Sequence, residues 1–117
     1  MVTADISQLT AECNTWRQQM RNYREEFTQL KNQLRQIARK VTGKDQLTDV
    51  DHFENQFHIQ LINIHNIKHE IKHHLKEAER HPNFGHRIPH HHIKEKYDML
   101  INDLDILEDE FHEFIKP

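Results

Sequence analysis

Apolar residues recur at alternating spacings of three and four along the first third of the chain. The pattern starts at Ile6 and continues without a miss to Val41, over about five heptads. Its positions are Ile6, Leu9, Cys13, Trp16, Met20, Tyr23, Phe27, Leu30, Leu34, Ile37 and Val41. This spacing is typical of a coiled-coil seam and predicts one long helix, over about residues 4–42, that packs lengthwise against other helices.

Two more apolar stripes follow at helical spacing. They predict helices over about residues 48–80 and about residues 89–116. The second stripe comprises Phe53, Phe57, Leu61, Ile64, Ile67, Ile71, Leu75 and Ala78, and the third comprises Ile93, Tyr97, Leu100, Leu104, Leu107, Phe111 and Phe114. Because every position of these stripes is apolar, we expect an entirely apolar core.

Turn-forming residues separate the three stripes. Gly43 follows the first stripe, where we expect it to adopt the left-handed conformation that often ends a helix. Thr48 is suited to cap the second helix with its hydroxyl group. Pro82 ends the second helix, and Pro89 fits the first position of the third.

Three helices joined by short connections predict an all-α fold, an antiparallel up-down-up three-helix bundle with coiled-coil-like packing. We expect residues 1–117 to form a single domain. In this arrangement the basic second half of the first helix lies at the same end as the acidic second half of the third helix. We therefore expect ion pairs between those two helices.

Composition supports few, long elements and limits the classes of function. The 117 residues include only two glycines and three prolines, which leave little room for a shaped active-site loop. No Gly-x-Ser-x-Gly elbow, glycine-rich phosphate loop or nucleic-acid-binding motif is present. We expect a protein that is not an enzyme and does not bind nucleic acid, with the cations of the first helix forming a solvated face.

No targeting or membrane signal stands out. No apolar stretch approaches the roughly 18 residues that a membrane helix needs, and no charged segment precedes an apolar one at the start. We expect a cytoplasmic protein without membrane contact. Cys13 is the only cysteine and falls on the seam, so we expect a buried thiol and no intrachain disulfide.

Twelve histidines are the most unusual feature of the composition. On the second helix His65, His69 and His73 are each one turn apart, the spacing at which imidazoles on one helix can share a metal ion. A second group surrounds the connection to the third helix and comprises His81, His86, His90, His91 and His92. Either group is a candidate site for zinc, nickel or copper. The candidate metal ligands are His65, His69, His73, His86, His90, His91 and His92.

The histidines also permit a response to pH. Protonation of all twelve would move the formal charge from −3 to +9. A solvated histidine-rich surface, a metal-bridged assembly and a pH-responsive assembly all remain compatible with this pattern.

Four apolar residues fall outside the predicted core. Ile59 and Ile62 lie on the outward side of the second helix, and Met99 and Ile106 lie on the outward side of the third. Pairs of exposed apolar residues at helical spacing are typical of helix-on-helix interfaces. We therefore expect a non-catalytic interaction module that binds a partner protein or a second copy of itself through these four residues. His58, His65 and His69 are their polar neighbours.

Overall fold

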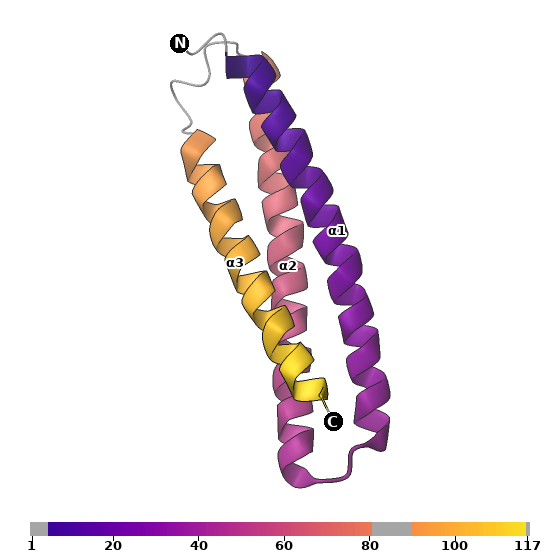
Figure 1. Ribbon diagram of the computed structural model, residues 1–117. Helices are drawn as coiled ribbons and strands as arrows, with labels where there is room; N and C mark the ends of the chain where they lie inside the picture. The colour runs from indigo at the N-terminus through magenta and orange to yellow at the C-terminus, as the bar shows by residue number, and fades with distance from the viewer. Residues whose placement is uncertain (1–4, 81–89, 117) are drawn as a thin grey trace.

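The computed structural model describes residues 5–80 and 90–116 and is all-helical over these residues. Its helices are α1 (Asp5–Lys40), α2 (Lys44–Arg80) and α3 (His90–Ile115), which lie lengthwise beside one another (Figure 1). The molecule measures 59 × 18 × 17 Å. Its Cα radius of gyration is 18.1 Å, against about 13 Å for a compact globule of this length. The all-helical prediction is confirmed.

The start of α2 differs from the prediction. This helix begins at Lys44, because the amide of Leu47 donates to the Gly43 carbonyl at 2.9 Å and closes a first turn there. Thr48 lies inside the helix, and its hydroxyl donates to the Lys44 carbonyl at 3.1 Å. The predicted Thr48 cap is therefore wrong, because the preceding residues Lys44, Asp45 and Gln46 are already part of the helix.

Gly43 also differs from its predicted conformation. Its φ is not positive, so it does not form a left-handed end to α1. Its carbonyl accepts the first hydrogen bond of α2 instead, and glycine is well tolerated at the residue that precedes a helix. The connection between the two helices is consequently only residues 41–43 long.

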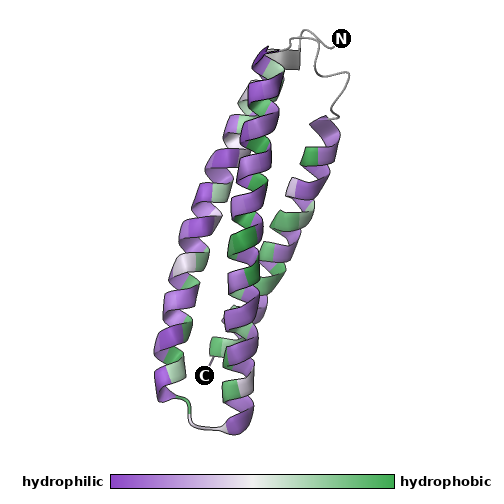
Figure 2. Ribbon diagram, turned by 180° about the vertical axis from the view of Figure 1, so that it is seen from behind, coloured by the Kyte–Doolittle hydropathy of each residue, from purple (hydrophilic) through white to green (hydrophobic). Residues whose placement is uncertain are grey.

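Hydrophobic positions form a stripe along each helix and meet in a common core (Figure 2). Phe27 of α1 packs against Phe57 of α2, with ring centroids 5.7 Å apart, and Phe57 packs against Phe111 of α3 at 5.1 Å. Phe53 packs against Phe114 at 5.0 Å. These contacts place the first half of α2 beside the last turns of α3.

The opposite ends of α2 and α3 also meet. Trp16 of α1 stacks on Tyr97 of α3 with ring centroids 5.2 Å apart, so the first halves of α1 and α3 lie beside each other. His74 of α2 lies in the same region and is only 2% exposed. The expectation of an entirely apolar core is therefore wrong at this residue.

The predicted ion pairs between the basic second half of α1 and the acidic second half of α3 are absent from residues 5–80 and 90–116. Two polar contacts join these helices: the Tyr23 hydroxyl donates to the Asp105 carboxylate at 2.9 Å, and Nε2 of His90 lies 3.5 Å from Oε1 of Glu12. At about 100° per residue, Arg17, Arg24 and Arg35 lie on one side of the α1 seam and Tyr23 on the other. The arginines therefore flank α2, not the acidic helix α3.

Candidate functional site

The four residues predicted to bind a partner are exposed on α2 and α3. Their exposed fractions are 40% for Ile59, 46% for Ile62, 69% for Met99 and 49% for Ile106. Their predicted outward position is confirmed, while the binding role stays a prediction. Figure 2 views the molecule with α2 in front and shows hydrophobic positions on the middle of that helix.

Met99 lines a shallow groove of about 290 Å³ between α2 and α3. The other residues that line it are Asn63, Asn66, Ile67, Glu70, Lys96, Leu100 and Asp103. Toward the N-terminal end of α3, Lys96 Nζ lies 3.4 Å from Glu70 Oε1 and joins the two helices across the groove. The groove thus combines an apolar floor with exposed amides and charges on its rims, as helix-binding surfaces do.

The register of α2 on α3 places three of the four residues on the same side of the two helices. Glu70 lies opposite Lys96 and Phe57 lies opposite Phe111, so Ile59 and Ile106 lie at nearly the same level along the groove. Ile62 is further from it, because at about 100° per residue it points almost directly away from the core of α2. Ile59, Met99 and Ile106 are therefore the better candidates for one continuous contact surface.

The predicted metal ligands are not gathered into one site. His65, His69 and His73 are all exposed on the outward side of α2. No group of three or more histidine, cysteine, aspartate or glutamate side chains placed to hold a metal ion occurs among the residues that the structure describes. Metal binding by this stripe stays a prediction.

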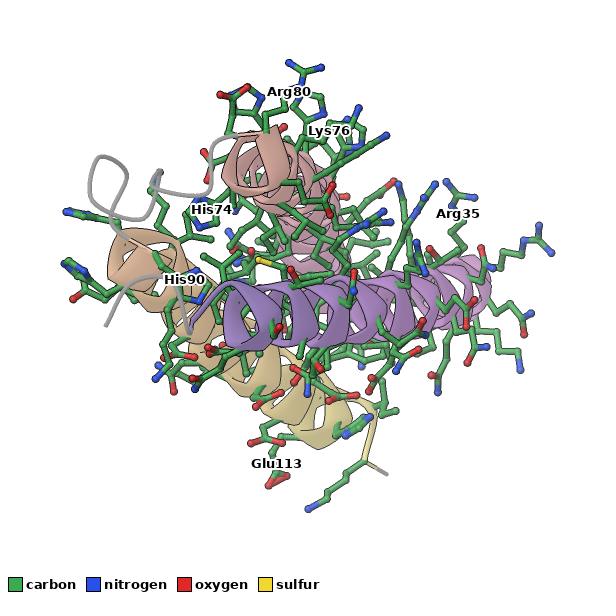
Figure 3. All side chains as sticks on the ribbon, turned by 90° about the horizontal axis from the view of Figure 1, so that it is seen from above. Arg35, His74, Lys76, Arg80, His90 and Glu113 are labelled. Atoms are coloured by element: carbon green, nitrogen blue, oxygen red, sulfur yellow. The ribbon has the colours of Figure 1, made fainter. Side chains whose placement is uncertain are left out.

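The second predicted histidine group divides in the structure. His86 lies outside the described residues. His91 and His92 are exposed and pack on each other, with ring centroids 5.0 Å apart. His90 instead turns toward α1 and α2 and contacts the buried His74 (Figure 3).

His74 and His90 form a histidine pair between α2 and α3. Nε2 of His74 lies 3.1 Å from Nδ1 of His90. The His90 ring stacks on Trp16 with centroids 4.9 Å apart, and its Nε2 lies 3.5 Å from Oε1 of Glu12. One histidine ring is thus held between an indole and a second imidazole, and its far nitrogen faces a carboxylate on α1.

The geometry of this pair limits how many protons it can hold. Only one of the two facing nitrogens can carry a proton, because two N–H groups 3.1 Å apart would repel. Burial lowers the pKa of His74, and the neighbouring His90 and His73 lower it further. The pair therefore favours a neutral His74.

His74 could have been found from the spacing of its neighbours. Ile67, Ile71, His74 and Ala78 recur at four, three and four, which continues the buried stripe of α2. The predicted apolar stripe did not include this position, and histidine is more often exposed than buried. It packs against His90, and this contact across 16 residues cannot be read from the α2 pattern alone.

Cys13 is fully buried, as predicted. Burial raises the pKa of its thiol to about 11, with a further contribution from Glu12 and a smaller opposing one from Arg17. Since the thiolate is the reactive form of cysteine, this side chain acts as a small apolar core residue.

Comparisons with protein-family models, curated proteins and solved structures find no match to this chain. No described helix has a long enough apolar stretch to cross a bilayer. Any functional conclusion therefore depends on the surfaces and side chains described above.

Proposed function

We propose that this chain is a non-catalytic helical interaction module of the cytoplasm that binds a partner protein, or a second copy of itself, through the outward faces of α2 and α3. Its solution structure would be the up-down-up three-helix bundle with coiled-coil-like packing. Ile59, Ile62, Met99 and Ile106 are its apolar anchors. The supporting observation is the exposure of these four large apolar side chains, of which Met99 lines the groove between α2 and α3.

The physical argument is the cost of keeping these side chains in water. Covering an apolar surface contributes about 25 cal/mol per Å², and large exposed apolar residues grouped on one side often mark interfaces. The groove beside Met99 runs along the helices, so an amphipathic helix could lie in it. Asn63, Asn66 and Asp103 would then form a polar rim.

The narrow shape of the molecule supports a role without catalysis. Its cross-section of 18 × 17 Å is filled by one layer of core side chains between three helices. Binding proteins need only an exposed surface, whereas most enzymes enclose much of their substrate in a pocket.

Light scattering on untagged protein tests the self-association form of this proposal. We expect a dimer mass for the wild type and a monomer mass for the Ile59→Asp and Met99→Asp variants, with helical circular dichroism unchanged. Leu47→Asp is the matched control, because Leu47 is 42% exposed but lies in the first turn of α2, about 18 Å along the helix from Ile59. Equal masses for the wild type and the groove variants would contradict self-association through this surface.

The second candidate function is histidine-mediated binding of zinc, nickel or copper, with assembly of a metal-bridged or pH-responsive dimer. It is favoured by the exposure of His65, His69 and His73 at one-turn spacing. One helix supplies too few ligands for a closed zinc site, so a second chain would complete it. A dimer that forms only with added metal and dissociates below about pH 6 would support this candidate.

A further inference from the structure

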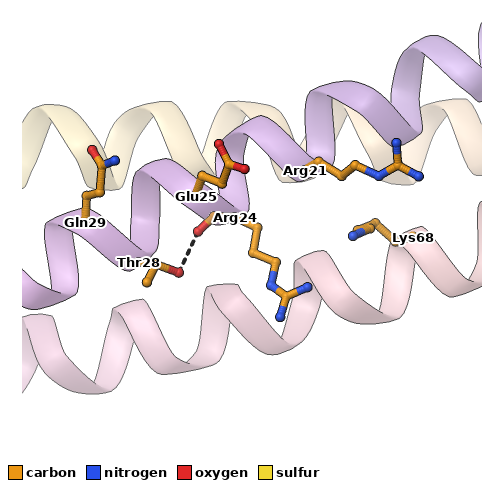
Figure 4. Close-up of a pocket in the computed structure, with 6 residues that line it drawn as sticks. All are labelled: Arg21, Arg24, Glu25, Thr28, Gln29 and Lys68. Carbon is orange, nitrogen blue, oxygen red and sulfur yellow. Dashed lines mark hydrogen bonds between the residues drawn. The ribbon is translucent and has the colours of Figure 1, made fainter.

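Four cationic side chains gather on the face between α1 and α2. Arg17, Arg21 and Arg24 come from α1, and Lys68 comes from α2. A surface hollow of about 550 Å³ is lined by Arg21, Arg24, Glu25, Thr28, Gln29 and Lys68 (Figure 4). We call Arg17, Arg21, Arg24 and Lys68 the basic cluster.

The basic cluster is not paired with carboxylates in the described part of the chain. None of its four side chains forms an ion pair within residues 5–80 and 90–116. Glu25 is the acidic residue at the hollow, but it points away from α2 and from Lys68 (Figure 4). Arg21 donates only to the neutral Gln18 amide, at 3.4 Å.

The pKa of Lys68 reflects the same crowding of positive charge. Partial burial lowers the pKa of Lys68, and Arg24, Arg21 and Arg17 lower it further. An anion placed in the hollow would therefore relieve repulsion that the free protein has to tolerate.

We propose that the basic cluster binds a linear oligophosphate anion. Guanidinium groups bind phosphate oxygens in pairs of parallel hydrogen bonds, and an ammonium group adds a point charge. Arg17 and Arg24 are seven residues apart, which is about 10 Å along a helix. A chain of two or three phosphates can place a separate phosphate group at each arginine, whereas a single phosphate offers fewer oxygens to the four cationic side chains.

The distribution of charge over the molecule favours a short anion over nucleic acid. The α1 segment carries seven cations and four carboxylates, while α3 carries two cations and eight carboxylates. Figure 3 shows Arg35 and Lys76 on one side of the molecule and Glu113 on the opposite side. A long polyanion would also be repelled by the carboxylates of α3, whereas a ligand confined to the basic cluster would not.

Titration calorimetry with tripolyphosphate at low ionic strength tests the proposal. We expect the double variant Arg21→Gln with Lys68→Gln to lose at least about tenfold in affinity, since it removes two charge-assisted contacts. The matched control, Arg35→Gln with Lys76→Gln, removes the same charge from the same two helices outside the hollow and should stay within about twofold of wild type. Orthophosphate should bind more weakly than tripolyphosphate.

Three results would overturn the proposal. They are no binding of tripolyphosphate to the wild type at millimolar concentration, an equal loss in both double variants, and binding of a single-stranded oligonucleotide without binding of tripolyphosphate.

A thermal melt of Lys68→Gln gives a second readout. This variant should melt above wild type without anion, because repulsion is removed, and should gain less from tripolyphosphate. A lower melting temperature with an undiminished gain would also contradict the site. The cluster and the α2–α3 groove lie on different faces, so either can fail alone.

Discussion

The two ends of the bundle use aromatic rings in different ways. Near the 41–43 connection, the core rings belong to phenylalanine and touch one another across all three helices. We call Phe27, Phe53, Phe57, Phe111 and Phe114 the phenylalanine end. It contains no group that can ionise, and its stability comes from apolar burial and edge-to-face ring contacts.

The opposite end surrounds its rings with polar atoms. We call Glu12, Trp16, His74, His90 and Tyr97 the histidine end. The Tyr97 hydroxyl is buried without a hydrogen-bond partner among the described residues, and burial raises its pKa to about 12. The same heptad spacing thus produces one end that is insensitive to protons and one that is sensitive.

The phenylalanine end should show the largest effect of a single substitution. Phe57 is fully buried and contacts rings of all three helices. Phe57→Ala should lower the free energy of unfolding by about 3–5 kcal/mol, because it leaves a cavity at the centre of the cluster. Urea unfolding measures this loss, and Phe114→Ala, at a half-buried site, should cost less. A loss below about 1 kcal/mol at Phe57 would mean that the cluster is not a packed core.

The histidine end should make stability depend on pH. The pKa of His74 is lowered from its ordinary 6.5 in the folded protein, so the unfolded chain takes up a proton more readily. The contribution of neutral His74 to the free energy of unfolding is fully present above pH 6.5. It falls as the pH drops toward the lowered pKa, by at most about 1.4 kcal/mol per pH unit. Urea unfolding between pH 8 and pH 5 measures the slope.

A variant pair separates His74 from the other histidines. In His74→Leu the slope should flatten, whereas His112→Gln, at an exposed site near the phenylalanine end, should keep the wild-type slope. Identical slopes in the wild type and His74→Leu would show that His74 is not the proton-sensitive group.

A smaller effect is expected between the two ends, where Tyr23 joins α1 to α3. Tyr23→Phe removes the hydrogen bond to Asp105 and should lower the free energy of unfolding by about 0.5–1.5 kcal/mol. Thermal unfolding measures the change, and Thr28→Val serves as a control because its hydroxyl bonds only within α1. An unchanged free energy of unfolding in Tyr23→Phe would mean that hydrogen bonds to water fully replace this bond.

The smallest effect is expected at Gly43, beside the phenylalanine end. A Cβ there would lie 3.3 Å from Oε1 of Gln46, an exposed side chain that can move. Gly43→Ala should therefore raise the free energy of unfolding by about 0.4–1 kcal/mol, through loss of freedom in the unfolded chain. The pH slope should not change. A lower free energy of unfolding for Gly43→Ala would indicate that Gly43 has a backbone conformation that alanine cannot adopt.

Much of the fold could be predicted, because heptad spacing reports directly which face of a helix is buried. Leu9, Cys13, Trp16, Met20, Phe27, Leu30 and Leu34 lie on the predicted α1 seam and are buried. The start of α2 could not be placed, since residues 44–47 carry no strong signal against either loop or helix. Boundaries depend on single hydrogen bonds, here the one from Leu47 to Gly43.

Less of the candidate sites than of the fold could be predicted from the sequence. The exposure of Met99 and Ile106 follows from periodicity within one helix, and the structure confirms it. The groove beside Met99, the His74–His90 pair and the basic cluster each need two helices in a definite register. Arg21 and Lys68, for example, are 47 positions apart in the chain, and no local pattern joins them.

Hydrogen exchange followed by mass spectrometry at pH 7.5 and pH 5.5, corrected for intrinsic rates, tests the contrast between the two ends most directly. Acid should reduce protection around His74 and in the first turns of α3, because protonation favours local opening of the histidine end. Protection around Phe57 and Phe111 should be retained until the whole molecule unfolds. Equal loss of protection at both ends would contradict the separation of the core into a proton-sensitive and a proton-insensitive part.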